Sequence, residues 1–209
     1  MARSTYPARL RVDYPEEQQD RVRVLFRPLL ALPIIVLLGV LTGGGGGQQS
    51  DDLLVVVVSS GGVIVLPVLL MIVFRRKYPR WWFDWNLELT RFSNRVGAYF
   101  LLLREEYPAT DAEQSVHIEI DYPDAEQDLS RWLPLVKWLL AIPHYVVLIV
   151  LAVMVVAITV IAWFAILFTG RYPRELFDIV VGWSRWALRV SAYAFLLTTD
   201  RYPPFSFDE

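Results

Sequence analysis

The chain has 209 residues, of which 55% are hydrophobic, and its mean hydropathy is +0.39. This composition is too apolar for an ordinary soluble domain and predicts an integral membrane protein. The net charge of −2 provides no basic excess to neutralise phosphates, which argues against nucleic acid as a partner. The absence of cysteine excludes disulfides, thiolate chemistry and cysteine-ligated metals.

The first 24 residues are polar and do not read as a cleaved signal peptide. Within them, the alternation of apolar and polar residues predicts a short, half-buried strand over 10–14. Arg21, Arg23 and Arg27 precede the first apolar run. By the positive-inside rule, these charges place the N-terminus in the cytoplasm.

Two membrane helices are predicted in the first half of the chain. The segment 25–41 is a marginal span, because it contains an arginine and two prolines, whereas 53–74 is long enough to cross the hydrocarbon core. A glycine-rich loop, 42–52, separates them. Four basic residues within 75–80 are typical of a cytoplasmic return after a helical hairpin.

The second half contains a predicted strand over 116–121 and a membrane helix over 131–168 with a break near Pro143. Its apolar part, 144–168, has no Asp, Glu, Lys or Arg and measures roughly 37 Å as a helix. A single crossing is therefore predicted there, and the segment 175–197 would have to return.

The hairpin in the first half and the single crossing with a return in the second half each give two crossings. Either arrangement puts the two strands on one side of the membrane. We expect the strands to form a small sheet on the membrane surface, because they are too short to stand alone. Phe205 and Phe207 suggest a third strand.

The chain contains an internal repeat. "YPRWWFDWNLELTRFSNRVGAYFLLL" at 78–103 matches "YPRELFDIVVGWSRWALRVSAYAFLL" at 172–197, with 12 identities over the 29 positions from 78 to 106. We therefore predict a mainly α fold of two tandem, pseudo-symmetric repeats, 1–109 and 110–209, each with membrane helices and one amphipathic interfacial helix (81–103 and 175–197). Tyr-Pro occurs seven times and is interpreted as marking the points where the chain meets the interface.

Each amphipathic helix carries four polar residues within about 80° of one another on a helix that turns roughly 100° per residue. We call these two sets the ridges; they are Asp84, Arg91, Arg95 and Tyr99 in the first copy, and Asp178, Arg185, Arg189 and Tyr193 in the second. In one interpretation, the ridges of two interfacial helices face water and headgroups. In the other, they are buried in a bundle, with Asp of one copy facing Arg of the other. Binding of an anionic lipid headgroup by the arginines is a variant of either.

The segment 139–205, from "LLAIPHYVVLIVL" through "FTGRYPRELFDIVVGWSRWALRVSAYAFLLTTDRYPPF", resembles a bacterial membrane family catalogued as a domain of unknown function, number 4389. The first half resembles it with departures, such as "FRRKYPRWWFDW" in place of "FTGRYPRELFDI". The resemblance implies a multi-pass protein of the bacterial inner membrane. It supplies no catalytic residue.

The hypothesis from sequence is a non-enzymatic scaffold, accessory or lipid-contacting membrane subunit with no cofactor and no metal site. Membrane lipid is the expected partner, with other membrane proteins or self-association as further options. The alternative is a small transporter or channel whose ridges line the repeat interface, because internal repeats with polar residues at their interface are typical of transporters.

Overall fold

The computed structural model describes residues 6–42, 63–109 and 114–208. It confirms a mostly helical chain with one small sheet. The elements in chain order are β1 (Ala8–Val12), α1 (Arg21–Thr42), α3 (Val63–Leu70), the π-helical turn η2 (Met71–Arg75), α4 (Arg80–Phe100), β2 (Val116–Ile120), α5 (Pro134–Leu140), α6 (Ile142–Thr169) and α7 (Arg174–Ala194).

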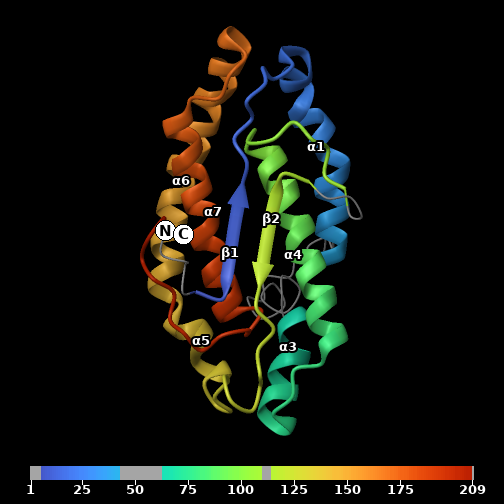
Figure 1. The fold of residues 1–209 in the computed structure, drawn as a ribbon, viewed down its shortest axis with the longest axis vertical. Helices are drawn as coiled ribbons and strands as arrows, with labels where there is room; N and C mark the ends of the chain where they lie inside the picture. The colour runs from blue at the N-terminus through green and yellow to red at the C-terminus, as the bar shows by residue number, and fades with distance from the viewer. Residues whose placement is uncertain (1–5, 43–62, 110–113, 209) are drawn as a thin grey trace, which may run out of the picture.

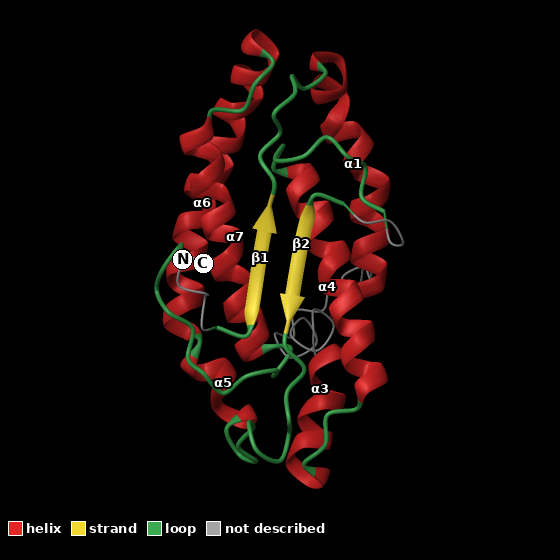
Figure 2. Ribbon diagram, in the orientation of Figure 1, coloured by secondary structure: helices red, strands yellow, loops and turns green. Residues whose placement is uncertain are grey.

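The two strands form an antiparallel ribbon along the middle of an elongated molecule (Figure 1). Their register runs from the pair Ala8 and Ile120 to the pair Val12 and Val116. Strand β1 packs against α7 and β2 against α4, with α6 and α1 at the outer edges (Figure 2). Each strand therefore rests on a helix from the other half of the chain.

Helices α4 and α7 begin in the same way. Each follows a Tyr-Pro dipeptide, and the prolines have nearly identical backbone angles, φ −63° and ψ 127° at Pro79 and φ −61° and ψ 126° at Pro173. Proline suits the start of a helix because its missing N–H would have no intrahelical partner there. The repeated Tyr-Pro-Arg motif thus sets where both helices start.

The core lies between the ribbon and the helices behind it. Alternate strand residues, among them Leu10 and Ile118, are buried, as the period of two predicts. They join Phe177 and Leu188 of α7 and Ile158 of α6 in one cluster. The ribbon is held in place by this core rather than by pairing alone, since an isolated two-stranded hairpin is only marginally stable.

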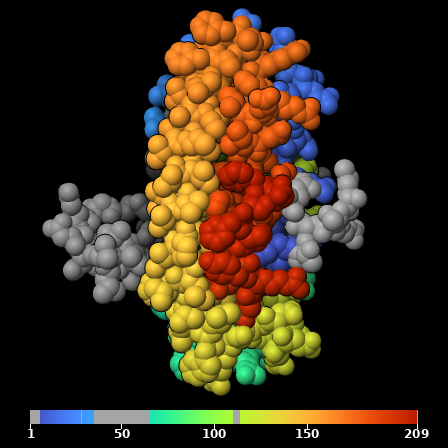
Figure 3. Space-filling view, turned by 90° about the vertical axis from the view of Figure 1, so that its left-hand side faces the viewer, coloured from blue at the N-terminus to red at the C-terminus, as the bar shows by residue number. Residues whose placement is uncertain are grey.

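Among the described residues, one helix, α6, is long and apolar enough to cross a membrane. Its 28 residues contain no Asp, Glu, Lys or Arg and extend over about 42 Å. Much of its surface is uncovered: Ile149, Val150 and Val153 are 66%, 65% and 70% exposed. Figure 3 shows α6, in yellow to orange, running from one end of the molecule to the other along one face.

The helical hairpin expected from 25–41 and 53–74 is not formed by the described residues. Helix α1 begins near one end of the long axis, whereas the α3–η2 segment ends at the other (Figure 1). Instead, α1 packs on α4 and α6, where Trp163 donates a hydrogen bond to the carbonyl of Val24 (3.2 Å). The glycine-rich loop and residues 53–62 lie outside the described part of the chain.

The third strand expected at Phe205 and Phe207 is also absent, since 201–208 forms no strand. The prolines at 203 and 204 have no N–H to donate to a ladder. The two rings pack on Trp186 instead, with centroids 5.4 and 5.9 Å away. A Cβ added to Gly182 of α7 would lie 2.7 Å from the Cβ of Phe207, so this glycine makes room for the C-terminal segment.

This close approach predicts that Gly182→Ala is destabilising. Alanine favours a helix over glycine by about 1 kcal/mol, but the clash with Phe207 resembles overpacking, which costs about 1–3 kcal/mol. Gly97→Ala in α4 is the matched control, because a Cβ there meets nothing within 4 Å. In unfolding titrations in detergent, we expect Gly182→Ala to be about 1–3 kcal/mol less stable than Gly97→Ala. Equal stability would contradict the packing of the C-terminal segment on α7.

Candidate functional site

The ridges do not present a uniform surface. The aspartates Asp84 and Asp178 are exposed, and Arg91, Arg95 and Arg185 are half-buried. Arg189, Tyr99 and Tyr193 are buried. The interior contacts of the ridges are therefore made by the arginines and tyrosines.

The first arginine of each ridge binds the ribbon. Arg91 Nε donates to the carbonyl of Ile118 in β2 (3.3 Å), and Arg185 Nε donates to the carbonyl of Leu10 in β1 (3.0 Å). Leu10 and Ile118 are direct partners across the ribbon. The two guanidinium groups thus approach the same cross-strand pair, each from its own helix.

These bonds meet a specific need of a two-stranded ribbon. Both of its strands are edge strands, and each presents carbonyl groups with no neighbouring strand to bond them. A buried backbone carbonyl without a donor costs about 1–3 kcal/mol. Arginine suits the position because its long stem crosses the helix–strand gap while its head supplies N–H donors.

The second arginine of each ridge holds the chain that follows its helix. Arg95 Nη1 donates to the carbonyl of Ala109 (2.7 Å). Arg189 donates to the carbonyls of Ser206 (Nη1, 3.2 Å) and Asp208 (Nη2). Both acceptor segments follow a Tyr-Pro dipeptide, so the second arginines fold these segments back onto α4 and α7.

The expected pairing of Asp in one copy with Arg in the other is not among the ion pairs of the described residues. Arg91 pairs with Glu88 on its own helix instead, at 2.6 Å. The half-buried Arg91 and Arg185 donate to backbone carbonyls, whereas Asp84 and Asp178 of the same ridges are exposed. The arginines of the ridges thus contact the protein's own backbone.

The ridge tyrosines lie under two buried cations that the sequence reasoning missed. The Arg27 guanidinium lies 4.7 Å from the ring centroid of Tyr99, and Lys137 Nζ lies 5.2 Å from that of Tyr193. Arg27 is 1% exposed and Lys137 is fully buried. Cation–π contacts of this kind are strongest when they are desolvated.

A sequence signal for both cations exists. Arg27 stands six residues before Pro33 and Lys137 six residues before Pro143, in the matching "LLALP" and "LLAIP" segments. Aligning these segments would have shown a basic residue at the same place in each copy.

The two cations differ in their acidic partners. Lys137 Nζ forms an ion pair with Asp200 (2.7 Å) and donates to the carbonyl of Thr199 (2.8 Å). Arg27 has no hydrogen-bond acceptor among the described residues. Glu106, which corresponds to Asp200 in the repeat, bonds Arg104 and Ser115 instead. A buried charge is costly without compensation, so Tyr99 supplies the main attraction for Arg27.

The tyrosines of the seven Tyr-Pro dipeptides differ in burial. Tyr6, Tyr78 and Tyr172 are buried within the protein, whereas Tyr107, Tyr122 and Tyr202 are exposed, and a role of Tyr-Pro at the membrane interface stays a prediction. Tyr14 Oη donates to the carbonyl of Tyr172, and Tyr122 Oη donates to that of Tyr78. A tyrosine after each strand thereby anchors the start of the helix motif in the other half.

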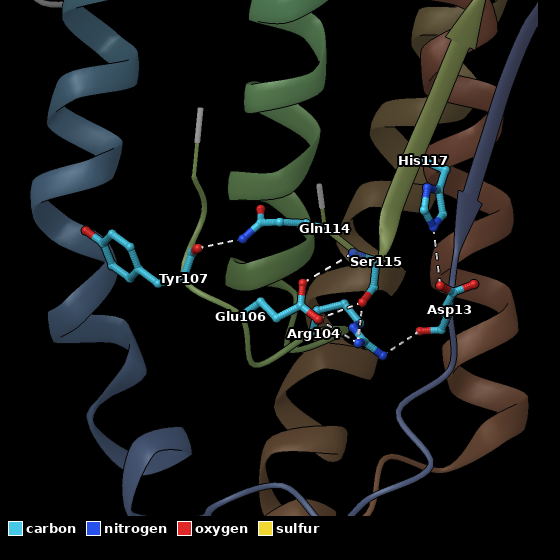
Figure 4. Close-up of polar contacts among 7 residues, drawn as sticks. All are labelled: Asp13, Arg104, Glu106, Tyr107, Gln114, Ser115 and His117. Carbon is cyan, nitrogen blue, oxygen red and sulfur yellow. Dashed lines mark hydrogen bonds and ion pairs between the residues drawn. The ribbon is translucent and has the colours of Figure 1, made fainter. Parts of the chain in front are cut away.

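A polar cluster joins the segment after α4 to the ribbon (Figure 4). Arg104 donates to Glu106 Oε1 (2.8 Å), to the Ser115 hydroxyl and to the carbonyl of Asp13 (3.1 Å). Ser115 Oγ donates to Glu106 Oε1 at 2.6 Å, and its N–H donates to Oε2 at 3.2 Å. His117 Nε2 lies 3.3 Å from Asp13 Oδ2. The carboxylate of Glu106 is thus saturated with donors, which suits a structural clamp.

The ionised form of Glu106 is favoured in this cluster. Burial alone would raise the pKa of its carboxyl, but the hydrogen bonds from Ser115 and Arg104 outweigh burial and lower the pKa below its usual value. Among the described residues, no group of three His, Asp or Glu side chains is arranged to hold a metal ion.

Together, these features define a helical protein built around an arginine-clamped ribbon and one membrane-length apolar helix. Residues 131–206 match the model of a family described as Domain of unknown function (DUF4389). The match confirms the resemblance noted in the sequence and spans α5, α6 and α7 with the second ridge. Comparisons with curated proteins and with solved structures gave no match.

The ribbon contacts predict different roles for the arginines and aspartates of the ridges. Arg91→Met and Arg185→Met leave a strand carbonyl without this donor, and we expect each to lower the unfolding free energy by about 1–3 kcal/mol. Backbone amides of β1 and β2 should exchange faster with deuterium. Asp84→Asn and Asp178→Asn are controls on the same helices and should change stability by less than about 0.5 kcal/mol. A larger effect of the aspartate changes than of the arginine changes would contradict the assignment.

The lowered pKa of Glu106 predicts an acid-sensitive clamp. A carboxyl whose pKa is lower in the folded state stabilises the fold above its unfolded pKa of about 4.3, and this contribution is lost as pH falls through the folded pKa. Glu106→Gln should therefore be less stable than wild type at neutral pH, by no more than about 1 kcal/mol because the site is partly exposed. The difference should shrink below about pH 4. A difference that is constant from neutral to acidic pH would count against the clamp.

Proposed function

We propose that this chain is a non-enzymatic integral membrane protein of the bacterial inner membrane, built as two pseudo-symmetric repeats, and that it acts as a scaffold, accessory or lipid-contacting subunit. The observation that carries the proposal is the uncovered apolar face of α6. The other elements of the proposal depend on this placement in lipid.

The surface of α6 fits lipid better than water. Twelve of its large apolar side chains are exposed, and exposed apolar patches of such extent mark protein or membrane contacts. They are Ile142, Val146, Val147, Ile149, Val150, Val153, Met154, Val156, Val160, Ile161, Phe164 and Phe168. The first half adds exposed Leu25, Phe26 and Leu29 on α1. In a bilayer these side chains need no protein partner.

Matched contacts support the duplication. Arg80 lies over the Tyr122 ring at 5.0 Å, and Arg174 lies over the Tyr14 ring at 5.3 Å. The arginine contacts to the ribbon and the tyrosine platforms for buried cations are paired in the same way. Duplication of one ancestral unit explains all of these paired contacts at once, whereas separate origins would require each pair to arise independently.

The non-enzymatic role is supported by how the polar side chains are used. The ridge arginines are engaged by backbone carbonyls, and Glu106 is saturated by Ser115 and Arg104. A general base needs a pKa near the working pH, whereas that of Glu106 is lowered.

One observation favours transport as a second candidate. The ribbon runs beside α7, which packs on α6, so all three share the same stretch of the long axis (Figure 1). If α6 crosses the bilayer along that axis, the exposed Glu119 and His117 lie at membrane depth. Charges at that depth face a water-filled space or a partner, which is typical of transporters.

Spin labels can test the placement of α6, and the absence of native cysteine makes single labels straightforward. We expect a label at Val153→Cys, in reconstituted vesicles, to be reached by oxygen and shielded from a water-soluble nickel reagent. A label at Glu126→Cys, in the exposed loop after β2, is the matched control and should be reached by the nickel reagent. Nickel access at position 153 equal to that at 126 would contradict the proposal.

Flux measurements separate the two candidates. A scaffold predicts that proteoliposomes carrying this chain leak ions and small solutes no faster than empty vesicles. Transport predicts a flux that Glu119→Gln alters, because that charge would lie in the conducting space. A flux of this kind would replace the scaffold with the transporter.

A further inference from the structure

The two apolar segments end with the same backbone turn but with different residues. Arg76 after η2 has φ 51°, and Gly170 after α6 has φ 75°. Their amides donate to equivalent carbonyls, of Ile72 (3.1 Å) and Ile166 (2.7 Å). Glycine adopts this left-handed conformation at little cost, whereas a residue with a Cβ is strained there. The first copy therefore carries arginine at a position whose backbone favours glycine.

Arg76 lies in a run of cations that the second copy lacks. Residues 75–77 are Arg-Arg-Lys, whereas the corresponding residues 169–171 are Thr-Gly-Arg. All three side chains of the basic run are exposed, and none forms an ion pair within the described residues. Their charge is thus available to an external anion.

The surroundings of this run match the boundary of a bilayer. Phe74 immediately precedes it and is 72% exposed, and Trp81 in the first turn of α4 is 69% exposed. Aromatic rings gather at the headgroup level, and cations next to them attract anionic lipid. The nearby carboxylates of Asp124 and Asp128 accept backbone N–H groups within their own loop, which already occupy them.

We propose that Arg75, Arg76 and Lys77 bind the headgroups of anionic phospholipids where the apolar α3–η2 segment leaves the membrane. The proposal rests on the membrane placement proposed above. It accounts for the strained Arg76, because glycine at this position would relax the backbone but remove a charge from the site. It also makes the two ends of the molecule unequal, since the turn at Gly170 lacks two of the three cations.

The test uses the full chain reconstituted in vesicles with equal amounts of phosphatidylglycerol and phosphatidylcholine. Native mass spectrometry then counts the lipids of each kind that remain on the extracted protein. Arg76→Gly removes both the charge and the strain, whereas Arg76→Lys, the matched control, keeps both. Each cation near the surface strengthens attraction to anionic lipid by about fivefold. We expect Arg76→Gly to lower the ratio of retained phosphatidylglycerol to phosphatidylcholine by about fivefold, and Arg76→Lys to leave it unchanged.

A measurement of thermal stability excludes the possibility that Arg76→Gly loses lipid because it unfolds. Because Arg76→Gly relieves the left-handed strain, its thermal midpoint in detergent should equal or exceed that of wild type. A wild-type lipid ratio in Arg76→Gly would overturn the proposal, as would an equal loss in Arg76→Lys. Displacement of the lipid by inorganic phosphate would also overturn it, since the site would then recognise free phosphate rather than a lipid.

The two proposals fail in distinguishable ways. If the chain enters pure phosphatidylcholine vesicles but shows no preference for phosphatidylglycerol, the lipid site falls and the membrane placement stands. If the chain does not enter phosphatidylcholine vesicles, both fall together.

Discussion

The structure depends on how a ribbon of only two strands keeps its edge carbonyls bonded. Arg91 and Arg185 do this by reaching from α4 and α7 to the carbonyls of Ile118 and Leu10. Because each strand rests on a helix from the other half of the chain, these bonds also join the halves. A free edge would otherwise invite pairing with other chains. These arginine contacts act together with the apolar core and the tyrosine hydrogen bonds, which also join the two halves.

The other buried polar groups of the ridges also bind parts of the same chain. Tyr99 and Tyr193 present their rings to Arg27 and Lys137, while Arg95 and Arg189 fold the following chain back onto the helices. Polar groups are costly to bury unless they are satisfied, and nearly all of these have a partner within the protein. Exposed apolar side chains lie along α6 and include Leu25, Phe26 and Leu29 of α1. The buried polar contacts thus lie mainly between the helices and the ribbon, while α6 keeps an exposed apolar surface.

Much of the fold could be predicted from the sequence, because the spacing of apolar residues within a short segment indicates a helix or a strand. The spacing of Asp84, Arg91 and Arg95 predicted that they share one face of a helix, and all three lie on α4. What this face contacts could not be predicted, because the acceptor of Arg91 is a carbonyl of β2, which comes from the other half of the chain. Arg27 and Lys137 were missed because a lone cation near an apolar run normally lies at the interface. Phe205 and Phe207 alternate as a strand would, but prolines precede them and tertiary packing on Trp186 decides their conformation.

The central claim, that the ridge arginines bind the ribbon rather than lipid, can be measured directly by solid-state NMR of the protein in phospholipid bilayers. Dipolar couplings between 15N-labelled arginine Nε and 13C-labelled strand carbonyls report the contacts of 3.3 Å at Ile118 and 3.0 Å at Leu10. Arg91→Lys and Arg185→Lys, which lack Nε, assign each signal. The account predicts that each variant abolishes the coupling to its own carbonyl only. Coupling of the two arginines to lipid phosphorus, with none to the strand carbonyls, would contradict it.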